Sequence, residues 1–186
     1  MEQTNSSLLA EFEGTQKTYA TFWERLLALL IDGLIIGVIT FPINYFNETI
    51  FKSFSLFVIF ALVGMIYKPF LEFKYGATLG KMVMKISIVT TSFEPINLTQ
   101  AILRNAFVLA SNIYGIVLTL IIFSSPNFAN VTTFTEYNAL SVSFTSHWAI
   151  GGYSLLTLID VICLLADNQK RSLHDRIGQT LVIKKS

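Results

Sequence analysis

The sequence has little charge. Of its 186 residues only 13% are Asp, Glu, Lys or Arg, whereas 53% are hydrophobic. A soluble domain usually has about 25% charged residues, and it needs them to stay in solution. The deficit excludes an ordinary soluble domain and predicts that lipid surrounds much of the surface of this protein.

Cysteine and histidine are also scarce. A single thiol, Cys163, excludes an internal disulfide and a multi-cysteine metal site. The two histidines, His147 and His174, fall on opposite sides of the membrane in the arrangement derived below, so they predict no metal pair. We therefore expect no metal and no cofactor. The net charge of +1 gives no indication of a nucleic-acid partner, and none is expected.

Long apolar runs take the place of the missing charge. A bilayer core about 30 Å thick needs roughly 20 apolar residues in a helix, and four runs approach this length. The first run contains Asp32, but its many Leu, Ile, Val and Phe residues outweigh the cost of inserting one carboxyl group. The sequence predicts an all-α membrane protein, a four-helix transmembrane bundle with helices near residues 25–43, 54–71, 101–123 and 148–166.

Basic residues are distributed unevenly among the segments that connect these runs. With four spans, the N-terminal segment, the second loop and the tail lie on one side, and only Lys52 falls on the other. Basic loops stay in the cytoplasm, which predicts a multi-pass protein of the cell (inner) membrane with both termini cytoplasmic. The basic residues on the predicted cytoplasmic side are Lys17, Arg25, Lys68, Lys74, Lys81, Lys85, Arg104, Lys170, Arg171, Arg176, Lys184 and Lys185.

The chain divides into a flexible cytoplasmic N-terminal segment, residues 1–18, and one transmembrane domain, residues 19–183. The segment 124–147 has no Lys or Arg and is expected to be an outer loop. Residues 85–90 and 180–183 resemble short strands. Because neither strand can leave its backbone groups without partners, we expect the two to pair as a small cytoplasmic β-ribbon.

Local signals mark the starts of two helices. Thr21 and Glu24 have the spacing of a capping box ahead of the first apolar run. Asn97 and Gln100 have the same spacing ahead of the third. Pro42 is expected to weaken the end of the first helix, because it has no backbone N–H.

Polar residues recur at a spacing of seven within three of the predicted helices, which places the members of each pair on one helix face. Such groups turn away from lipid and satisfy one another. One interpretation is a proton or ion path through Asp32 and Asp160, and the other is a hydrogen-bond network that fixes helix packing. The pairs are Arg25 with Asp32, Asn105 with Asn112, Arg104 with Ser111, and Asp160 with Asp167.

Catalytic motifs are incomplete. His174 and Asp175 follow Ser172 closely, but a hydrolytic triad is recognised by its geometry and not by such proximity in sequence. We therefore expect a protein that is not an enzyme.

Three motifs, in order, resemble the RDD family of membrane proteins, which is named for one arginine and two aspartates. Ala20, Phe22, Arg25, Ala28, Ile31 and Asp32 are similar to the opening of the family. Gly76, Thr78, Gly80 and Lys81 are similar to its Gly-x-Thr-x-Gly-Lys segment, and Leu173, His174, Asp175 and Arg176 to its closing signature. Asp160, Asp167 and Asp175 compete as the second aspartate, and Asp175 or Asp167 fits best.

The resemblance implies two functions. Some members of the family look like regulators of membrane proteases, and others like sodium–proton antiporters. The first hypothesis is a non-enzymatic accessory or regulatory protein that binds another membrane protein. The alternative is a homo-oligomeric proton or cation transporter that uses intramembrane aspartates, since four helices alone make a narrow path. The lipid bilayer is the partner common to both, together with a membrane-protein partner or self-association.

Overall fold

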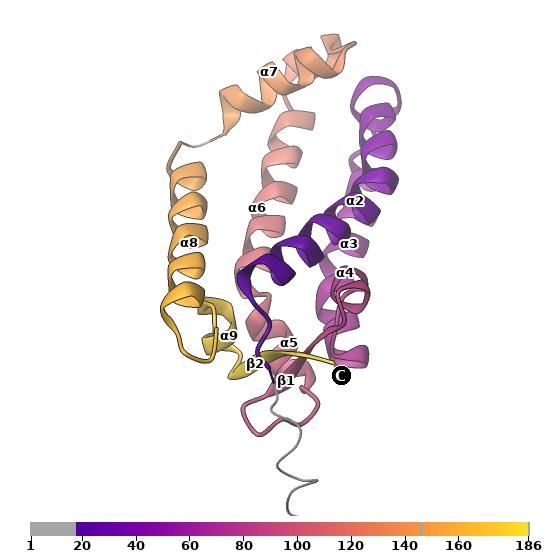
Figure 1. Cartoon of the computed structure of the whole chain (residues 1–186). Coiled ribbons are helices and arrows are strands. Elements are labelled where there is room, and N and C mark those ends of the chain that lie inside the picture. The colour runs from indigo at the N-terminus through magenta and orange to yellow at the C-terminus, as the bar shows by residue number, and fades with distance from the viewer. Residues whose placement is uncertain (1–17, 146, 186) are drawn as a thin grey trace, which may run out of the picture.

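A computed structural model describes residues 18–145 and 147–185, with only the backbone of residues 147–150 (Figure 1). Nearly all of the predicted N-terminal segment, residues 1–17, lies outside this range. Four long helices run between two ends of the molecule. We call the end that carries the two strands the ribbon end, and the other the α7 end.

The first long helix, α2 (Phe22–Phe46), begins with the predicted capping box, in which the Thr21 backbone N–H donates to Glu24 Oε2 over 2.8 Å. The helix passes through Pro42 and continues as the π-helical turn η1 (Asn47–Phe51). It is therefore longer than the predicted 25–43.

The second long helix, α3 (Phe54–Tyr75), ends at Gly76, which has a φ of 66°. Glycine adopts this left-handed conformation without the steric cost that a side chain would add. The chain turns there into the short helix α4 (Leu79–Val83) and the strand β1 (Ile86–Thr90).

The predicted third helix is two helices, α5 (Leu98–Arg104) and α6 (Ala106–Phe123), which are separated at Asn105. The predicted capping box at Asn97 and Gln100 is confirmed. The side-chain amide of Asn105 donates to the Ala101 carbonyl. Such local side-chain bonds compete with the regular helical pattern and account for the break.

The segment 124–147 is not a plain loop, contrary to the expectation from its composition. It contains the 3₁₀ helix η2 (Pro126–Asn130) and the helix α7 (Phe134–Phe144). A capping box of Thr133 and Glu136 starts α7 and explains its formation in a polar segment. Helix α7 lies across the end of the molecule, above α6 (Figure 1).

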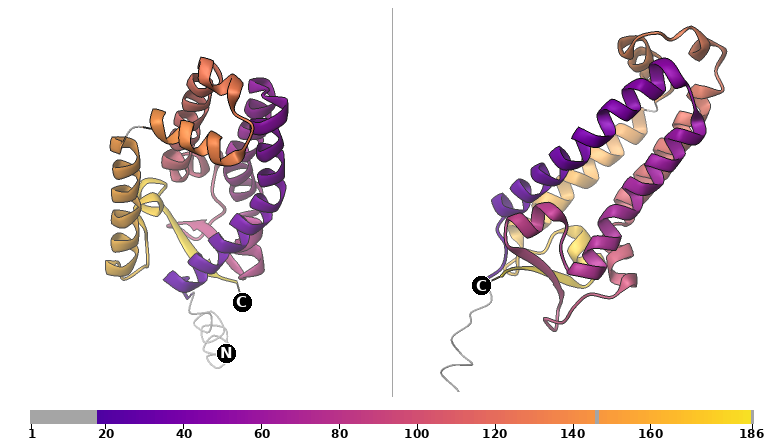
Figure 2. Two further views of the ribbon diagram at one scale, coloured as in Figure 1. Left: turned by 90° about the horizontal axis from the view of Figure 1, so that it is seen from above. Right: turned by 90° about the vertical axis from the view of Figure 1, so that its right-hand side faces the viewer.

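The fourth long helix, α8 (His147–Ala166), returns to the ribbon end, where α9 (Leu173–Ile177) and β2 (Thr180–Lys184) follow. The predicted ribbon is confirmed, because β1 and β2 pair antiparallel with Ile88 opposite Val182. Seen from above, α8 stands at one side of the molecule and α2 and α3 at the other (Figure 2).

Three helical segments of the described chain are long and apolar enough to cross a membrane: Phe22–Phe51, Phe54–Tyr75 and Ala106–Phe123. The apolar part of α8, Gly151–Ala166, is shorter, so the fourth span stays a prediction. Within the part of the chain that the structure describes, the buried apolar clusters lie at the two ends and not in the middle. One contains Ala20, Ala28, Ile86, Ile88, Ile96, Ala101 and Val182, and the other Ile122, Phe128, Val131 and Tyr137.

Candidate functional site

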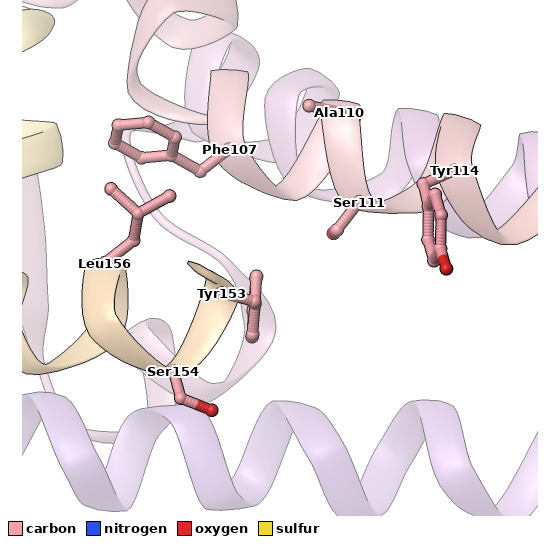
Figure 3. Close-up of a pocket in the computed structure, with 7 residues that line it drawn as sticks. All are labelled: Phe107, Ala110, Ser111, Tyr114, Tyr153, Ser154 and Leu156. Carbon is pink, nitrogen blue, oxygen red and sulfur yellow. The ribbon is translucent and has the colours of Figure 1, made fainter. Parts of the chain in front are cut away.

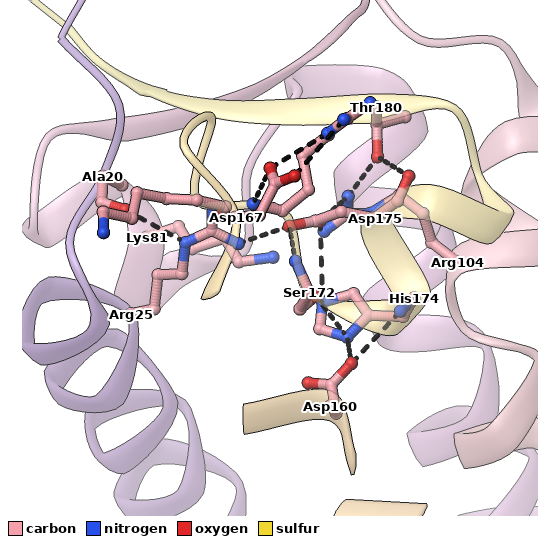
Figure 4. A network of polar contacts seen from close by, with 12 residues as sticks. Ala20, Arg25, Lys81, Arg104, Asp160, Asp167, Ser172, His174, Asp175 and Thr180 are labelled. Atoms are coloured by element: carbon pink, nitrogen blue, oxygen red, sulfur yellow. Dashed lines mark hydrogen bonds and ion pairs between the residues drawn. The ribbon is translucent and has the colours of Figure 1, made fainter. Parts of the chain in front are cut away.

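The site at the ribbon end centres on Asp175 of α9, which is fully buried (Figure 4). Arg25 of α2 donates from Nη1 to Asp175 Oδ2 over 2.5 Å. Arg104 of α5 donates to Asp175 Oδ1 and to the hydroxyl of Thr180. Arg25 also donates from Nη2 to the Lys170 carbonyl over 2.5 Å. One carboxylate therefore joins α2, α5 and the C-terminal segment.

A second carboxylate, Glu72 near the end of α3, extends this network. It accepts from Lys81 Nζ over 2.6 Å and from Asn105 Nδ2 over 2.8 Å. Arg104 Nε lies 3.5 Å from Glu72 Oε2, so this arginine faces both carboxylates. We call the group of Arg25, Glu72, Lys81, Arg104 and Asp175 the clasp.

Burial makes the charges of the clasp dependent on one another. The side chains of Arg104, Glu72 and Asp175 are 2%, 4% and 0% exposed. Burial alone would raise the pKa of Asp175, but the positive charges of Arg104, His174 and Arg25 lower it well below the ordinary value. Burial opposes the charge of Arg104, yet Asp175 and Glu72 raise its pKa. The clasp is thus a set of ion pairs in a water-poor site.

The pKa of Lys81 is lowered, so its charged form is disfavoured, in contrast to Arg104. Burial is the largest cause, and the nearby charge of Arg104 acts in the same direction. Glu72 opposes the shift through its charge and its hydrogen bond. The hydrogen bond to Glu72 shows that the lysine of the Gly-x-Thr-x-Gly-Lys segment points into the molecule, toward α3.

Asp32 occupies a separate buried position, further along α2 than Arg25. It accepts from Thr78 Oγ1 over 2.5 Å, from the Gly80 backbone N–H over 2.8 Å and from Tyr67 Oη over 3.1 Å. A Cβ on Gly80 would lie 2.0 Å from the carbonyl oxygen of Ala28. Only glycine allows α4 to approach α2 closely enough for its N–H to reach Asp32.

Asp160 of α8 faces the closing motif. Its Oδ1 accepts from the His174 backbone N–H over 3.1 Å and lies 2.8 Å from His174 Nδ1. Ser172 Oγ lies 2.9 Å from the same ring nitrogen. A serine, a histidine and an aspartate are thus close together, but Ser172 is only 1% exposed, which leaves its hydroxyl no open path to a substrate.

The remaining predicted site residues lie outside the clasp. Asn112 donates to the Val108 carbonyl of its own helix. Asp167 pairs with Arg171 and Arg176, and the hydrogen bond from Arg171 lowers the pKa of Asp167. Asp175, and not Asp167, contacts Arg25. The two members of each predicted seven-residue pair therefore bind different partners.

Sequence reasoning did not single out Glu72 or Glu48. Glu72 lies just beyond the predicted end of its helix, and its charge one turn before Gly76 was the available signal. Glu48 lies in the π-helical turn at the α7 end and is only 6% exposed. Its Oε2 has no hydrogen-bond partner among the described residues. Burial and the charge of Glu48 raise the pKa of Tyr137 on α7 to about 12.

A cleft of about 430 Å³ separates α6 from α8 (Figure 3). Because of this cleft, α8 is not packed tightly against α6. The walls of the cleft carry aromatic, aliphatic and small side chains. The lining residues are Phe107, Ala110, Ser111, Tyr114, Tyr153, Ser154 and Leu156.

Comparison with known proteins gives one positive finding. The family model described as the RDD family matches residues 19–179, a range that contains every residue of the clasp. No significant match was found among curated proteins or among solved structures.

Proposed function

The chain belongs to the RDD family, and from this premise we propose that it is a non-enzymatic accessory protein that binds and regulates another membrane protein. Its apolar helices make it a membrane protein. We also propose that the ribbon end faces the cytoplasm, because nearly all basic residues of the sequence belong to segments at that end.

One observation carries the accessory role: the two faces of α4 differ. Gly80 and Lys81 point inward and bind Asp32 and Glu72. The other residues of this helix present an apolar face beside the membrane boundary, which suits contact with a second membrane protein. We call this surface the α4 face. Its residues Leu79, Met82 and Val83 are 38%, 37% and 64% exposed.

Site-specific photo-crosslinking in the cell membrane tests this role. A photoreactive residue at Met82 or Val83 should yield the same crosslinked membrane protein from both positions. Val38 on α2, which is 74% exposed, serves as the control and should not yield it. If the α4 positions give only crosslinks between copies of this chain, the accessory role is contradicted.

A transport function is the second candidate, and the surroundings of Asp32 favour it. This carboxylate is 3% exposed within an apolar helix, and its hydrogen-bond donors are the neutral groups of Thr78, Gly80 and Tyr67. A buried carboxylate held by neutral donors is suited to take up a proton or a cation.

Everted membrane vesicles distinguish this candidate from the accessory role. Sodium-driven proton movement should occur with the natural chain, assembled as a homo-oligomer, and should vanish in Asp32→Asn. Identical traces from both proteins would contradict transport.

A further inference from the structure

We propose that Arg171 and Arg176, at the ribbon end of α8, bind the headgroup phosphate of an anionic phospholipid whose acyl chains lie along α8. The proposal concerns residues outside the clasp and does not depend on the accessory role. It starts from two arginines that share one carboxylate and from an exposed apolar row on the adjoining helix.

Asp167 holds the two guanidinium groups in fixed positions. Arg171 donates to it from Nε over 3.1 Å and from Nη2 over 3.3 Å, and Arg176 donates from Nη2 over 3.0 Å. The Arg171 backbone N–H also donates to Asp167 Oδ2 over 3.0 Å. Because a guanidinium carries five N–H groups, each arginine keeps donors for a second anion. Fixing their positions in advance lowers the entropy cost of binding that anion.

The charge around this pair is positive. One carboxylate, Asp167, faces two arginines, and Lys170 precedes Arg171 in sequence. The neighbouring carboxylates Asp160 and Asp175 are already bound to His174 and to the clasp arginines. The side chains of Arg171 and Arg176 are 32% and 47% exposed, so an anion can reach them. Arginine suits phosphate because its planar fork donates two parallel hydrogen bonds.

An apolar row on α8 indicates that the anion belongs to a lipid. The residues follow one another at intervals of three, four and three, so they form one exposed stripe along α8, the helix that ends directly before Asp167. A free phosphate would leave this stripe uncovered, whereas a phospholipid brings hydrocarbon chains on the same molecule. Leu155, Leu158, Ile162 and Leu165 are 59%, 60%, 59% and 58% exposed.

Lipid retention by the full chain provides the test. The purified protein is exchanged into bilayer nanodiscs with equal amounts of phosphatidylglycerol and phosphatidylcholine. The lipids that remain bound after gentle release into detergent are counted by native mass spectrometry. Phosphatidylglycerol should be retained preferentially, and R171Q/R176Q should lower that preference on the order of tenfold. K74Q/K85Q removes the same charge elsewhere at the ribbon end and should retain the preference.

Two further arms distinguish a bound phospholipid from general charge attraction and from a free phosphate site. R171K/R176K keeps both charges without the planar forks, and it should lose most of the preference. Inorganic phosphate at millimolar concentration should neither bind detectably nor displace the lipid. The melting temperature in phosphatidylcholine alone should be similar for all variants, which shows that they are folded.

The proposal is overturned by any of four results. These are no lipid preference in the natural chain, equal losses in R171Q/R176Q and K74Q/K85Q, full preference in R171K/R176K, or displacement by inorganic phosphate. If R171Q/R176Q does not fold, R171K/R176K against K74Q/K85Q decides the matter.

Discussion

At the scale of single residues, buried charge determines which side chains the fold depends on. Asp175 is the shared acceptor of Arg25 and Arg104, and both arginines are themselves largely buried. Removing one member of such a group leaves the other charges without a partner in a water-poor site, which costs more than the lost contact itself. Asp167 differs, because its two arginine partners remain in contact with water.

We therefore predict that Asp175→Asn lowers the free energy of unfolding by about 3–5 kcal/mol. Denaturation in mild detergent, followed by tryptophan fluorescence, measures the change. Asp167→Asn is the matched control, because it also removes a carboxylate from two arginines, and it should cost about 1 kcal/mol or less. Similar losses in both variants would show that the clasp is not held together by buried charge.

The effect of Asp175→Asn should not depend on pH above the range in which histidine titrates. The folded-state pKa of Asp175 is lowered, so its stabilising contribution is complete above the unfolded-state pKa of about 3.9 and is lost only as pH falls below that value. The stability difference between the natural chain and the variant should be the same at pH 8 and pH 9, above the range in which a histidine of ordinary pKa, about 6.5, changes its charge. A difference that changes between these two values would assign the pH-sensitive group elsewhere.

Glu48 gives the opposite prediction. It is a buried carboxylate with one oxygen that has no hydrogen-bond partner among the described residues. A neutral amide of the same shape does not carry the desolvation cost that burial imposes on the charged form of a carboxyl group. Glu48→Gln should leave stability unchanged or raise it, by on the order of 1 kcal/mol. A marked loss in thermal denaturation would mean that the carboxyl group makes a stabilising contact that an amide cannot replace.

At the scale of elements, the contact between α4 and α2 depends on the absence of one side chain. Gly80 lies against the Ala28 carbonyl, and this approach also brings the Gly80 N–H to Asp32. We predict that Gly80→Ala separates the two helices and destabilises the protein by roughly 1–3 kcal/mol through overpacking. Gly37→Ala on α2 is the control, because a Cβ there meets nothing within 4 Å. Thermal denaturation of both variants measures the difference, and equal stability would contradict the close approach.

Features that depend on neighbouring residues could be predicted from the sequence, whereas features that depend on contacts between distant segments could not. The capping boxes at Thr21 and Asn97 depend on residues three positions apart, and the β-ribbon on alternation within short segments, so all were predictable. The break at Asn105 was not, because its amide also binds Glu72 of another helix. Helix α7 had a local signal at Thr133 and Glu136 that the polar composition of its segment concealed.

For the candidate site, the sequence identified several of the residues but not which of them pair. Family resemblance and helical spacing indicated Arg25, Asp32, Arg104 and Asp175 as important polar residues. The pairing was beyond sequence reasoning, because Arg25 and its partner Asp175 are 150 positions apart. Spacing placed Arg25 and Asp32 on one face of the same helix, and the fold gives each of them different partners.

At the scale of the whole molecule, both ends of the described chain lie at the ribbon end. Tyr19 pairs with Ile183, and the Lys184 backbone N–H donates to the Thr18 carbonyl over 2.9 Å. Because the two ends are joined in this way, we expect the chain to cross the membrane an even number of times. This expectation makes α8 the fourth crossing.

Cysteine labelling tests this arrangement. In a chain with Cys163→Ala, single cysteines at Thr18 and Lys185 should react with a membrane-impermeant maleimide only when the cytoplasmic side is exposed. A cysteine at Asn130 of η2, at the α7 end, should react only from the opposite side. Labelling of positions 18 and 185 from different sides would exclude four crossings.

The bond between Arg25 and Asp175 has a consequence for biosynthesis. The arginine enters the membrane boundary with the first of the described long helices, but its carboxylate partner leaves the ribosome only after all four of these helices have been made. Until then Arg25 and Arg104 carry charges that Asp175 does not yet balance. Completion of the native state must therefore follow translation of residues 172–184, and a chain released before that point would present unpaired arginines to the quality-control machinery of the cell.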